Sequence, residues 1–165
     1  MNSAAHSSFV YVTFIRTTPQ KLWSALTGKE FMKQYWFGMH MEAEWKAGAP
    51  WRMVFADGHT ADAGEVVEVD PPKRLVLKWG NEFKPELKSE GYSRCVMELE
   101  PMGEAVKLTV THSMDRPESK FIQAVSGGWP RVLSNLKSLL ETGEIVLKVR
   151  EIDDPAHRGL PSSAA

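Results

Sequence analysis

The sequence has few of the features that mark secreted, metal-bound or nucleic-acid-binding proteins. One cysteine, Cys95, excludes an internal disulfide framework and a thiolate zinc cluster, and it favours a cytoplasmic location. The 165 residues carry 20 Lys and Arg against 21 Asp and Glu without a run of like charge, which argues against a nucleic-acid partner. No apolar stretch approaches the ~20 residues that span a bilayer, and the first residues lack a secretory signal. We therefore expect no membrane partner.

Large and adaptable side chains are the unusual part of the composition. The chain has 6 Trp and 8 Met, in an otherwise ordinary background of 42% hydrophobic and 25% charged residues. Its length predicts one domain. Such side chains suit the lining of an irregular apolar space, and they suit a filled core equally well. Composition alone therefore leaves the function open.

The first part of the chain predicts one strand followed by two short helices. Residues 9–15 are mostly β-branched or aromatic, which is typical of a strand. Thr18 and Pro19 then supply a helix N-cap and a proline at the first helical position. Residues 27–30 form a capping-box pattern directly after the first helix, so a second helix is expected to reach Trp36.

Residues 39–112 alternate between apolar and polar side chains with a period of two. Gly- and Pro-containing turn signals separate the apolar runs, which predicts consecutive antiparallel strands with one apolar and one solvated face. From Pro117 the period becomes helical until Gly143, and Pro130 predicts a kink or restart within that helix.

The end of the chain predicts an extra element. Residues 145–149 alternate like a strand, and a lone apolar strand is unstable in water, so it would pair with its own sheet or with a second copy in a homodimer. We divide the chain into an N-terminal tail (1–8), a domain (9–143) and a C-terminal extension with a strand and a tail (144–165).

This order of elements predicts an α+β helix-grip fold. A curved antiparallel sheet of six to seven strands would carry two short helices, with the long C-terminal helix packed across its apolar face. The sequence resembles the activator-of-heat-shock-protein-ATPase-like branch of the SRPBCC superfamily (START, polyketide cyclase and Bet v 1-like proteins). The motifs that carry the resemblance lie in residues 18–26, 45–48, 64–75, 108–113 and 127–133.

The predicted inward faces define a candidate ligand site between sheet and helix. Curved sheet-plus-helix folds leave apolar pockets of the kind that bind small ligands. The expected lining consists of one histidine and nine apolar residues: Trp36, Trp51, Met53, Phe55, Trp79, Met97, His112, Phe121, Val125 and Trp129. His112 is the one candidate catalytic residue, because its ordinary pKa is near neutral, and its alternative role is that of a strand-end histidine bonded to the backbone.

Other polar groups carry weaker signals. His40, Glu42 and Glu44 alternate on one strand face and residues 59–62 span a turn, but neither set has metal-ligand spacing, so we expect a solvated face and a polar loop, with no metal and no cofactor. Cys95 is interpreted as a buried thiol used as a small hydrophobe.

Three functions from different classes remain open. The first is a non-catalytic binder of a small hydrophobic or aromatic molecule, and the second is a polyketide-cyclase-like enzyme that uses the same cavity, although no acid/base pair is apparent. The third is a chaperone or stress-response regulator, as the resemblance implies. The eukaryotic coactivators that resemble this domain carry an additional N-terminal domain that grips the chaperone. Since only about eight residues precede the first predicted strand, we expect that domain to be absent and its activity not to carry over.

Overall fold

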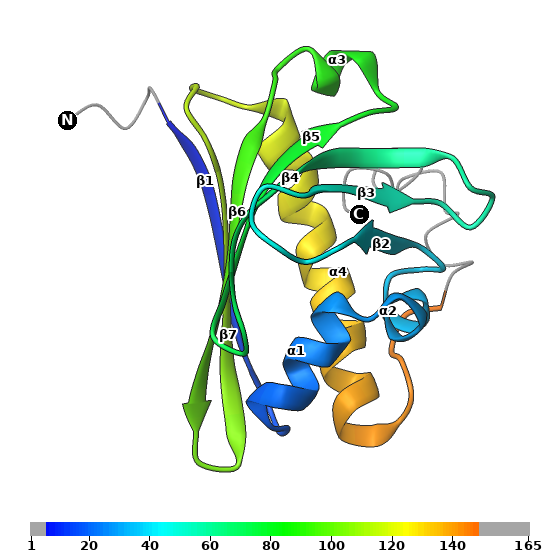
Figure 1. The fold of residues 1–165 in the computed structure, drawn as a ribbon, viewed down its shortest axis with the longest axis vertical. Helices are drawn as coiled ribbons and strands as arrows, with labels where there is room; N and C mark the ends of the chain where they lie inside the picture. Colours follow the sequence, from blue (N-terminus) through cyan, green and yellow to red (C-terminus); the bar gives the residue numbers. More distant parts are fainter. Residues whose placement is uncertain (1–5, 149–165) are drawn as a thin grey trace.

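The computed structural model describes residues 6–148, which form a seven-stranded antiparallel sheet and four helices (Figure 1). The strands are β1 (Ser7–Ile15), β2 (His40–Ala43), β3 (Pro50–Val54), β4 (Thr60–Asp70), β5 (Arg74–Asn81), β6 (Ser93–Met102) and β7 (Ala105–Met114). The helices are α1 (Pro19–Thr27), α2 (Lys29–Tyr35), α3 (Pro85–Lys88) and α4 (Lys120–Thr142). The sheet order is β1-β7-β6-β5-β4-β3-β2, so the predicted α+β helix-grip fold is confirmed.

The long helix α4 lies within the curve of the sheet (Figure 1). Its start is capped by Ser119, whose hydroxyl accepts a hydrogen bond from the backbone N–H of Ile122 at 3.1 Å. Gly143 ends it in the left-handed conformation, with φ of 86°. The expected restart at Pro130 does not occur, because the helix continues through this residue. Buried side chains on both sides of Pro130 hold the helix against the sheet, which offsets the one missing N–H bond.

A carboxylate from another part of the chain also holds the start of α4. Glu90 follows α3, and its two oxygens accept hydrogen bonds from the Ser119 hydroxyl at 2.6 Å and from the backbone N–H of Lys120 at 2.9 Å. A negative charge at this end of a helix is favourable because the helix dipole is positive there. Glu90 therefore fixes where α4 begins over the sheet.

The two short helices follow β1 as predicted, but their junction differs in detail. Thr18 caps α1 through its side chain, which accepts from the backbone N–H of Lys21. The expected capping box at residues 27–30 does not form, since the Thr27 hydroxyl donates to the Trp23 carbonyl at 2.8 Å. Gly28 takes the cap position of α2 without a side-chain bond.

The sheet bends because two strand pairs carry irregularities. The register shifts between Met53 and Val54 where β3 meets β4, and between Val66 and Glu68 where β4 meets β5. Such bulges increase the local twist and bend a strand. The half of the sheet from β2 to β5 consequently turns around α4 (Figure 1).

The residues after α4 do not form the expected strand. The side-chain amide of Asn135 on α4 forms hydrogen bonds with their backbone. Its oxygen accepts from the N–H groups of Val146 and Leu147, and its nitrogen donates to the Leu147 carbonyl at 2.9 Å. Backbone groups bonded to a buried side chain are not free to join a sheet, and residues 145–148 contain a bend at 146–147 and no strand. Val149 of the predicted strand lies outside the described residues.

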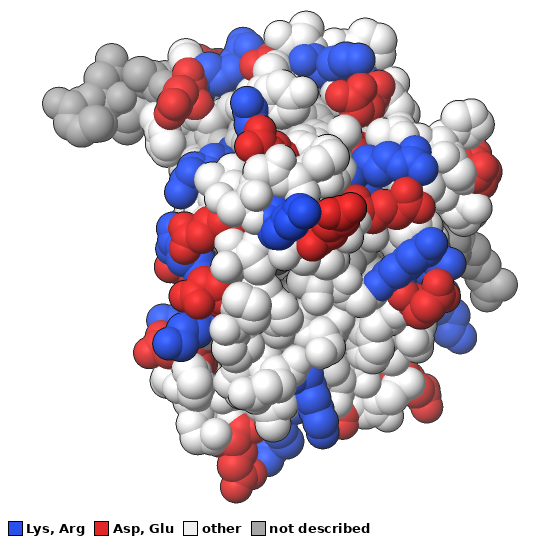
Figure 2. All heavy atoms as spheres, in the orientation of Figure 1, with Lys and Arg blue, Asp and Glu red and all other residues white. Residues whose placement is uncertain are grey.

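The visible surface mixes charges of both signs. Figure 2 shows Lys and Arg beside Asp and Glu over the upper part and along the margins of this face, with a mostly uncharged area at its lower centre. Several of these neighbours are ion pairs, including Arg74 with Glu98 at 2.6 Å. Within residues 6–148, no helix combines the length and apolar character needed to cross a membrane.

Candidate functional site

Four tryptophans meet in the space between the sheet and α4. Trp51 and Trp79 come from β3 and β5, Trp129 comes from α4, and Trp36 follows α2. The ring centroid of Trp79 lies 4.7 Å from that of Trp51, 5.8 Å from that of Trp129 and 6.4 Å from that of Trp36. All four are at most 2% exposed. Aromatic side chains therefore occupy the centre of the interior, in ring contact with one another.

His112 joins this cluster through two hydrogen bonds. The indole N–H of Trp129 donates to Nδ1 at 3.1 Å, and Nε2 lies 2.7 Å from the Ser93 hydroxyl. The Ser93 hydroxyl in turn donates to the Trp79 carbonyl, so it receives the Nε2 proton of a neutral ring. Burial lowers the pKa of His112 to about 3. His112 is thus neutral at pH 7 and connects the sheet to α4, with both ring nitrogens engaged.

A buried acid lies on the same inner face of the sheet. Asp62 on β4 is fully buried, and its Oδ1 accepts a hydrogen bond from the Asn81 amide at 3.2 Å. Burial raises the pKa of Asp62 well above its ordinary value. The Trp79 indole lies close enough to oppose that rise, but without hydrogen-bond geometry. Asp62 is therefore a candidate for a carboxyl group that stays protonated near neutral pH.

Four buried side-chain polar atoms have no hydrogen-bond partner within the described residues; His40 Nδ1 lies on β2, and the other three lie in this interior. These three are the indole nitrogens of Trp36 and Trp79 and the Oδ2 oxygen of Asp62. Buried polar groups are nearly always paired in native proteins, so each exception calls for an explanation. Here the three interior exceptions belong to one cluster, since the Trp36 and Trp79 rings are in contact and Trp79 lies beside Asp62.

We expect Asp62→Asn to stabilise the protein at neutral pH. Burial raises the pKa of Asp62 well above that in the unfolded chain, which releases this proton above about pH 4, so rising pH favours unfolding of the wild type. Asparagine removes this penalty and still accepts from Asn81. Thermal denaturation should show the variant melting several degrees above wild type at pH 7, with the gap shrinking toward pH 4.

The exposed Asp57 serves as the matched control. Hydrogen bonds from the backbone and ring of His59 lower the pKa of Asp57, the opposite direction to Asp62. Asp57→Asn should therefore give no gain at pH 7. Equal melting temperatures for Asp62→Asn and wild type at pH 7 would show that Asp62 is ionised in the folded protein.

Most of the predicted lining residues lie together in the interior, and one does not. Met53, Met97, Phe121 and Val125 are buried in the same core as the tryptophans, and Phe121 contacts His112. Phe55 is half-buried and packs against Phe83, with ring centroids 5.3 Å apart. The period of two that predicted an inward position for Phe55 does not extend to this residue, because β3 ends at Val54, just after the register shift.

Asp62 was missed because residues 59–62 resemble a polar turn. β4 in fact begins at Thr60, so Asp62 already belongs to the strand. Its partner across the ladder is Asn81, two residues after Trp79 and hence on the same face. The available signal was the period of two that leads back from buried Val66 through Gly64 to Asp62.

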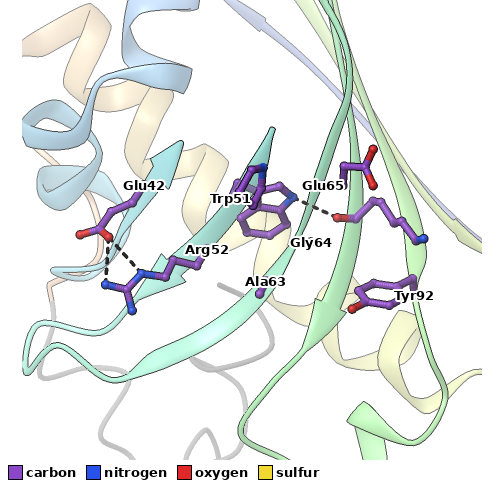
Figure 3. Close-up of a pocket in the computed structure, with 9 residues that line it drawn as sticks. Glu42, Trp51, Arg52, Ala63, Gly64, Glu65 and Tyr92 are labelled. Carbon is purple, nitrogen blue, oxygen red and sulfur yellow. Dashed lines mark hydrogen bonds and ion pairs between the residues drawn. The ribbon is translucent and has the colours of Figure 1, made fainter. Parts of the chain in front are cut away.

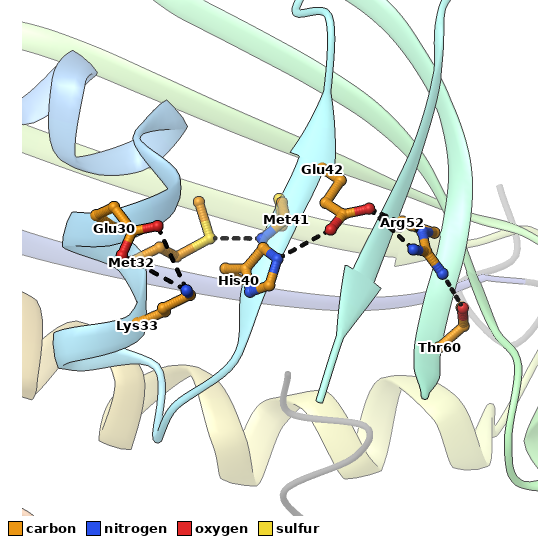
Figure 4. Close-up of polar contacts among 8 residues, drawn as sticks. All are labelled: Glu30, Met32, Lys33, His40, Met41, Glu42, Arg52 and Thr60. Carbon is orange, nitrogen blue, oxygen red and sulfur yellow. Dashed lines mark hydrogen bonds and ion pairs between the residues drawn. The ribbon is translucent and has the colours of Figure 1, made fainter. Parts of the chain in front are cut away.

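The polar side chains of β2 and β3 form a row of paired groups (Figure 4). Nε2 of His40 lies 3.1 Å from Glu42, which accepts from Arg52, and Arg52 also donates to Thr60. Among residues 6–148, no three acidic, histidine or cysteine side chains are grouped as a metal site. Burial raises the pKa of the Cys95 thiol, which keeps it protonated.

A pocket of about 560 Å³ lies on the face of β3, β4 and β5 that points away from α4 (Figure 3). Small residues, Ala63 and Gly64, form part of its lining, and Tyr92 stands at one side. Its two cations have neighbours: Arg52 pairs with Glu42, and Lys78 lies over the Tyr92 ring at 4.8 Å. The alternation of apolar and polar residues predicted a solvated face here, and nothing in the sequence indicated a pocket on it.

Known proteins share both the family signature and the fold. The model of the family "Activator of Hsp90 ATPase homolog 1-like protein" matches residues 16–141. Protein MLL2253 from Mesorhizobium loti has a similar structure, with a TM-score of 0.71 and 23% identity over 84% of this chain and 100% of that one. No curated protein sequence matches significantly.

Two further solved structures with this fold belong to proteins whose names bear on function. The Aha1 dimer from Colwellia psychrerythraea has a TM-score of 0.67 and 19% identity, over 83% of this chain and 98% of that one. PFC0360w, described as an HSP90 activator from Plasmodium falciparum, has a TM-score of 0.66 and 23% identity, over 81% and 95% of the two chains. At these identities the structures show a shared fold, while the family model covers most of the sequence. The chain therefore belongs to the Activator of Hsp90 ATPase homolog 1-like family.

Proposed function

We propose that this protein binds a small hydrophobic or aromatic molecule between the sheet and α4. The unpartnered indole nitrogens of the neighbouring Trp36 and Trp79, the second of which lies beside the buried Asp62 carboxyl, support this proposal most directly. Two N–H donors and a protonated carboxyl are complementary to a carbonyl or hydroxyl oxygen on an otherwise apolar ligand. The surrounding rings would stack on its flat part.

Ligand entry requires side chains to move, because rings fill the interior. Trp36 is the best candidate for the moving group, since it follows α2 directly and precedes a short irregular connection. Phe37 and Gly38 in this connection have φ of 54° and 83°. Only a few residues thus separate the Trp36 ring from a segment able to absorb a backbone change. A pocket that opens in this way is a minor conformation that a ligand makes dominant.

The same site supports an enzyme as the second candidate. An acid in a water-poor interior with a raised pKa is suited to general acid–base chemistry. Asp62 is better suited to that role than His112, because both nitrogens of His112 are engaged by Trp129 and Ser93. Under this alternative, Asp62→Asn would abolish turnover and leave ligand binding nearly unchanged.

The relatives support two proposals about partners. The family description and the Plasmodium structure name Hsp90 activation, which supports chaperone regulation as a third function for this chain. The Colwellia relative is described as a dimer, which supports a homodimer here.

The ligand proposal is tested by titrating tryptophan fluorescence with flat aromatic and acyl compounds. A molecule of about ten to twenty heavy atoms is expected to bind with micromolar affinity, by the usual energy per atom of small ligands. Because four of the 6 Trp lie at the site, binding should change the emission saturably.

Two variants make this experiment specific. Trp36→Phe keeps a ring but removes one unpartnered N–H, so it should weaken binding of carbonyl-bearing compounds more than that of hydrocarbons of equal size. Trp23→Phe on α1 is the control, because Trp23 lies outside the cluster of four rings, and it should leave both affinities unchanged. The absence of saturable change for every compound would contradict the proposal.

A further inference from the structure

Strand β1 forms a largely apolar edge of the sheet. Its nine residues include no charged residue, proline or glycine. β1 pairs with β7 and has no second strand neighbour within residues 6–148. Val10, Val12 and Phe14 are 56%, 44% and 48% exposed on one face of it. Proteins normally protect an edge strand with charges, proline, bulges or a covering element.

The opposite edge shows that protection. β2 has only four residues, and its Glu42 is held by His40 and Arg52. Helix α2 packs against β2 and α4 packs against β1, so each edge strand has a helix beside it. The two edges differ in length and in charged side chains, and β1 is therefore the less protected edge for strand pairing.

The backbone of β1 offers free groups at this edge. Lys137 of α4 donates to the Phe14 carbonyl, so this carbonyl points away from β7. Successive residues of an antiparallel strand direct their backbone groups to alternate sides. The N–H and C=O groups of Val10 and Val12 therefore also point away from β7, with no helix side chain bonded to them among the described contacts.

We propose that β1 pairs antiparallel with β1 of a second copy, with Val10 of each copy opposite Val12 of the other. This two-fold register pairs the free backbone groups of Val10 and Val12 and places the exposed valines side by side on one face. It also sets Phe14, whose carbonyl already accepts from Lys137, opposite Ser8 of the other copy. The inference rests on the homodimer proposed above and specifies its surface.

The charges at the ends of β1 favour this antiparallel arrangement. Asp115 is fully exposed at the N-terminal end, where its Oδ1 lies 3.7 Å from Nδ1 of His6. Arg16 stands at the C-terminal end, in an exposed pair with Glu104. Antiparallel pairing brings Arg16 of one copy toward Asp115 of the other, whereas parallel pairing would bring the two Arg16 side chains together.

The contact is small, so the dimer should be weak. A strand of nine residues is about 30 Å long, and pairing along one edge buries an area at the low end of specific interfaces. The dimer fraction should therefore rise with protein concentration. Sedimentation of the wild-type chain over a range of concentrations should show a monomer–dimer equilibrium.

Lysine substitutions test the surface itself. Val10→Lys with Val12→Lys places charges on the edge and should leave the chain monomeric at every concentration, with an unchanged melting temperature in dilute solution. Thr109→Lys is the control, because Thr109 pairs with Val12 one strand inward on the same face and should still dimerise. In the wild type, hydrogen exchange at the Val10 and Val12 amides should slow as concentration rises.

The possible outcomes distinguish the proposal of the β1 surface from the proposal of a homodimer. A wild-type chain that stays monomeric overturns both proposals. A dimer that survives the paired lysines, or amides whose exchange is independent of concentration, overturns the β1 surface and leaves the homodimer standing. Loss of the dimer in Thr109→Lys would indicate stacking of sheet faces, and this too overturns edge pairing.

Discussion

Trp129→Ala is expected to lower the free energy of unfolding by about 3–5 kcal/mol, the usual effect of removing a large buried aromatic ring. The Trp129 ring contacts those of Trp36, Trp79 and His112, so its removal leaves a cavity bounded by rings from three different elements. The variant also leaves Nδ1 of His112 without its donor. Chemical denaturation followed by far-UV circular dichroism measures the change.

Two variants separate packing from the hydrogen bond. Trp129→Phe keeps most of the ring contacts but removes the N–H, so it should cost about 1–3 kcal/mol, the range for a buried acceptor left unpaired. Trp23→Ala removes a half-buried tryptophan of α1 and should cost less than Trp129→Ala. Equal losses for Trp23→Ala and Trp129→Ala would show that the aromatic cluster is not the centre of the core.

Gly64→Ala is expected to be the most disruptive single-methyl change in the sheet. A Cβ at Gly64 would lie 1.7 Å from the Lys78 carbonyl oxygen and 3.0 Å from Nε1 of Trp51. Trp51 uses that space to donate to the same carbonyl at 3.0 Å, from a strand on the other side of β4. Because backbone atoms cannot move aside cheaply, we expect a loss of at least about 3 kcal/mol.

Gly80→Ala is the matched control for this effect. Its Cβ would meet the Tyr92 ring at 2.9 Å, a short contact of a different kind. Tyr92 is 54% exposed, so its ring has solvent to move into. Thermal denaturation should show a large drop for Gly64→Ala and a small one for Gly80→Ala. Similar drops for both would mean that the β4–β5 pair adjusts its backbone easily.

Local patterns in the chain were sufficient for the order and kind of most elements. The period of two from residues 39 to 112 and the helical period after Pro117 depend only on neighbouring side chains, and both predictions are confirmed. The helix boundaries at Thr18 and Gly143 follow from residue-specific backbone preferences, and the structure has them where the sequence indicates. The burial of nearly all predicted inward residues follows from the same alternation.

Structural features that depend on residues distant in the sequence could not be predicted from local patterns. The strand expected at residues 145–149 depends on whether a free partner exists, and Asn135 takes its backbone groups instead. The capping box at residues 27–30 failed because the Thr27 hydroxyl has a nearer carbonyl in α1. Phe55 lies just beyond the register shift in β3 and is only half-buried, with its ring against that of Phe83.

The sequence by itself determined the helix-grip fold, the family and the identity of the tryptophans and His112 as interior residues. Only the tertiary structure decided what these residues do. In the folded chain, both ring nitrogens of His112 form hydrogen bonds, one with Trp129 and one with Ser93, and Asp62 is buried beside Trp79. The physical reason is that periodicity reports which face a side chain occupies, whereas hydrogen-bond partners and pKa values depend on groups that the curved sheet and α4 bring together from distant parts of the chain.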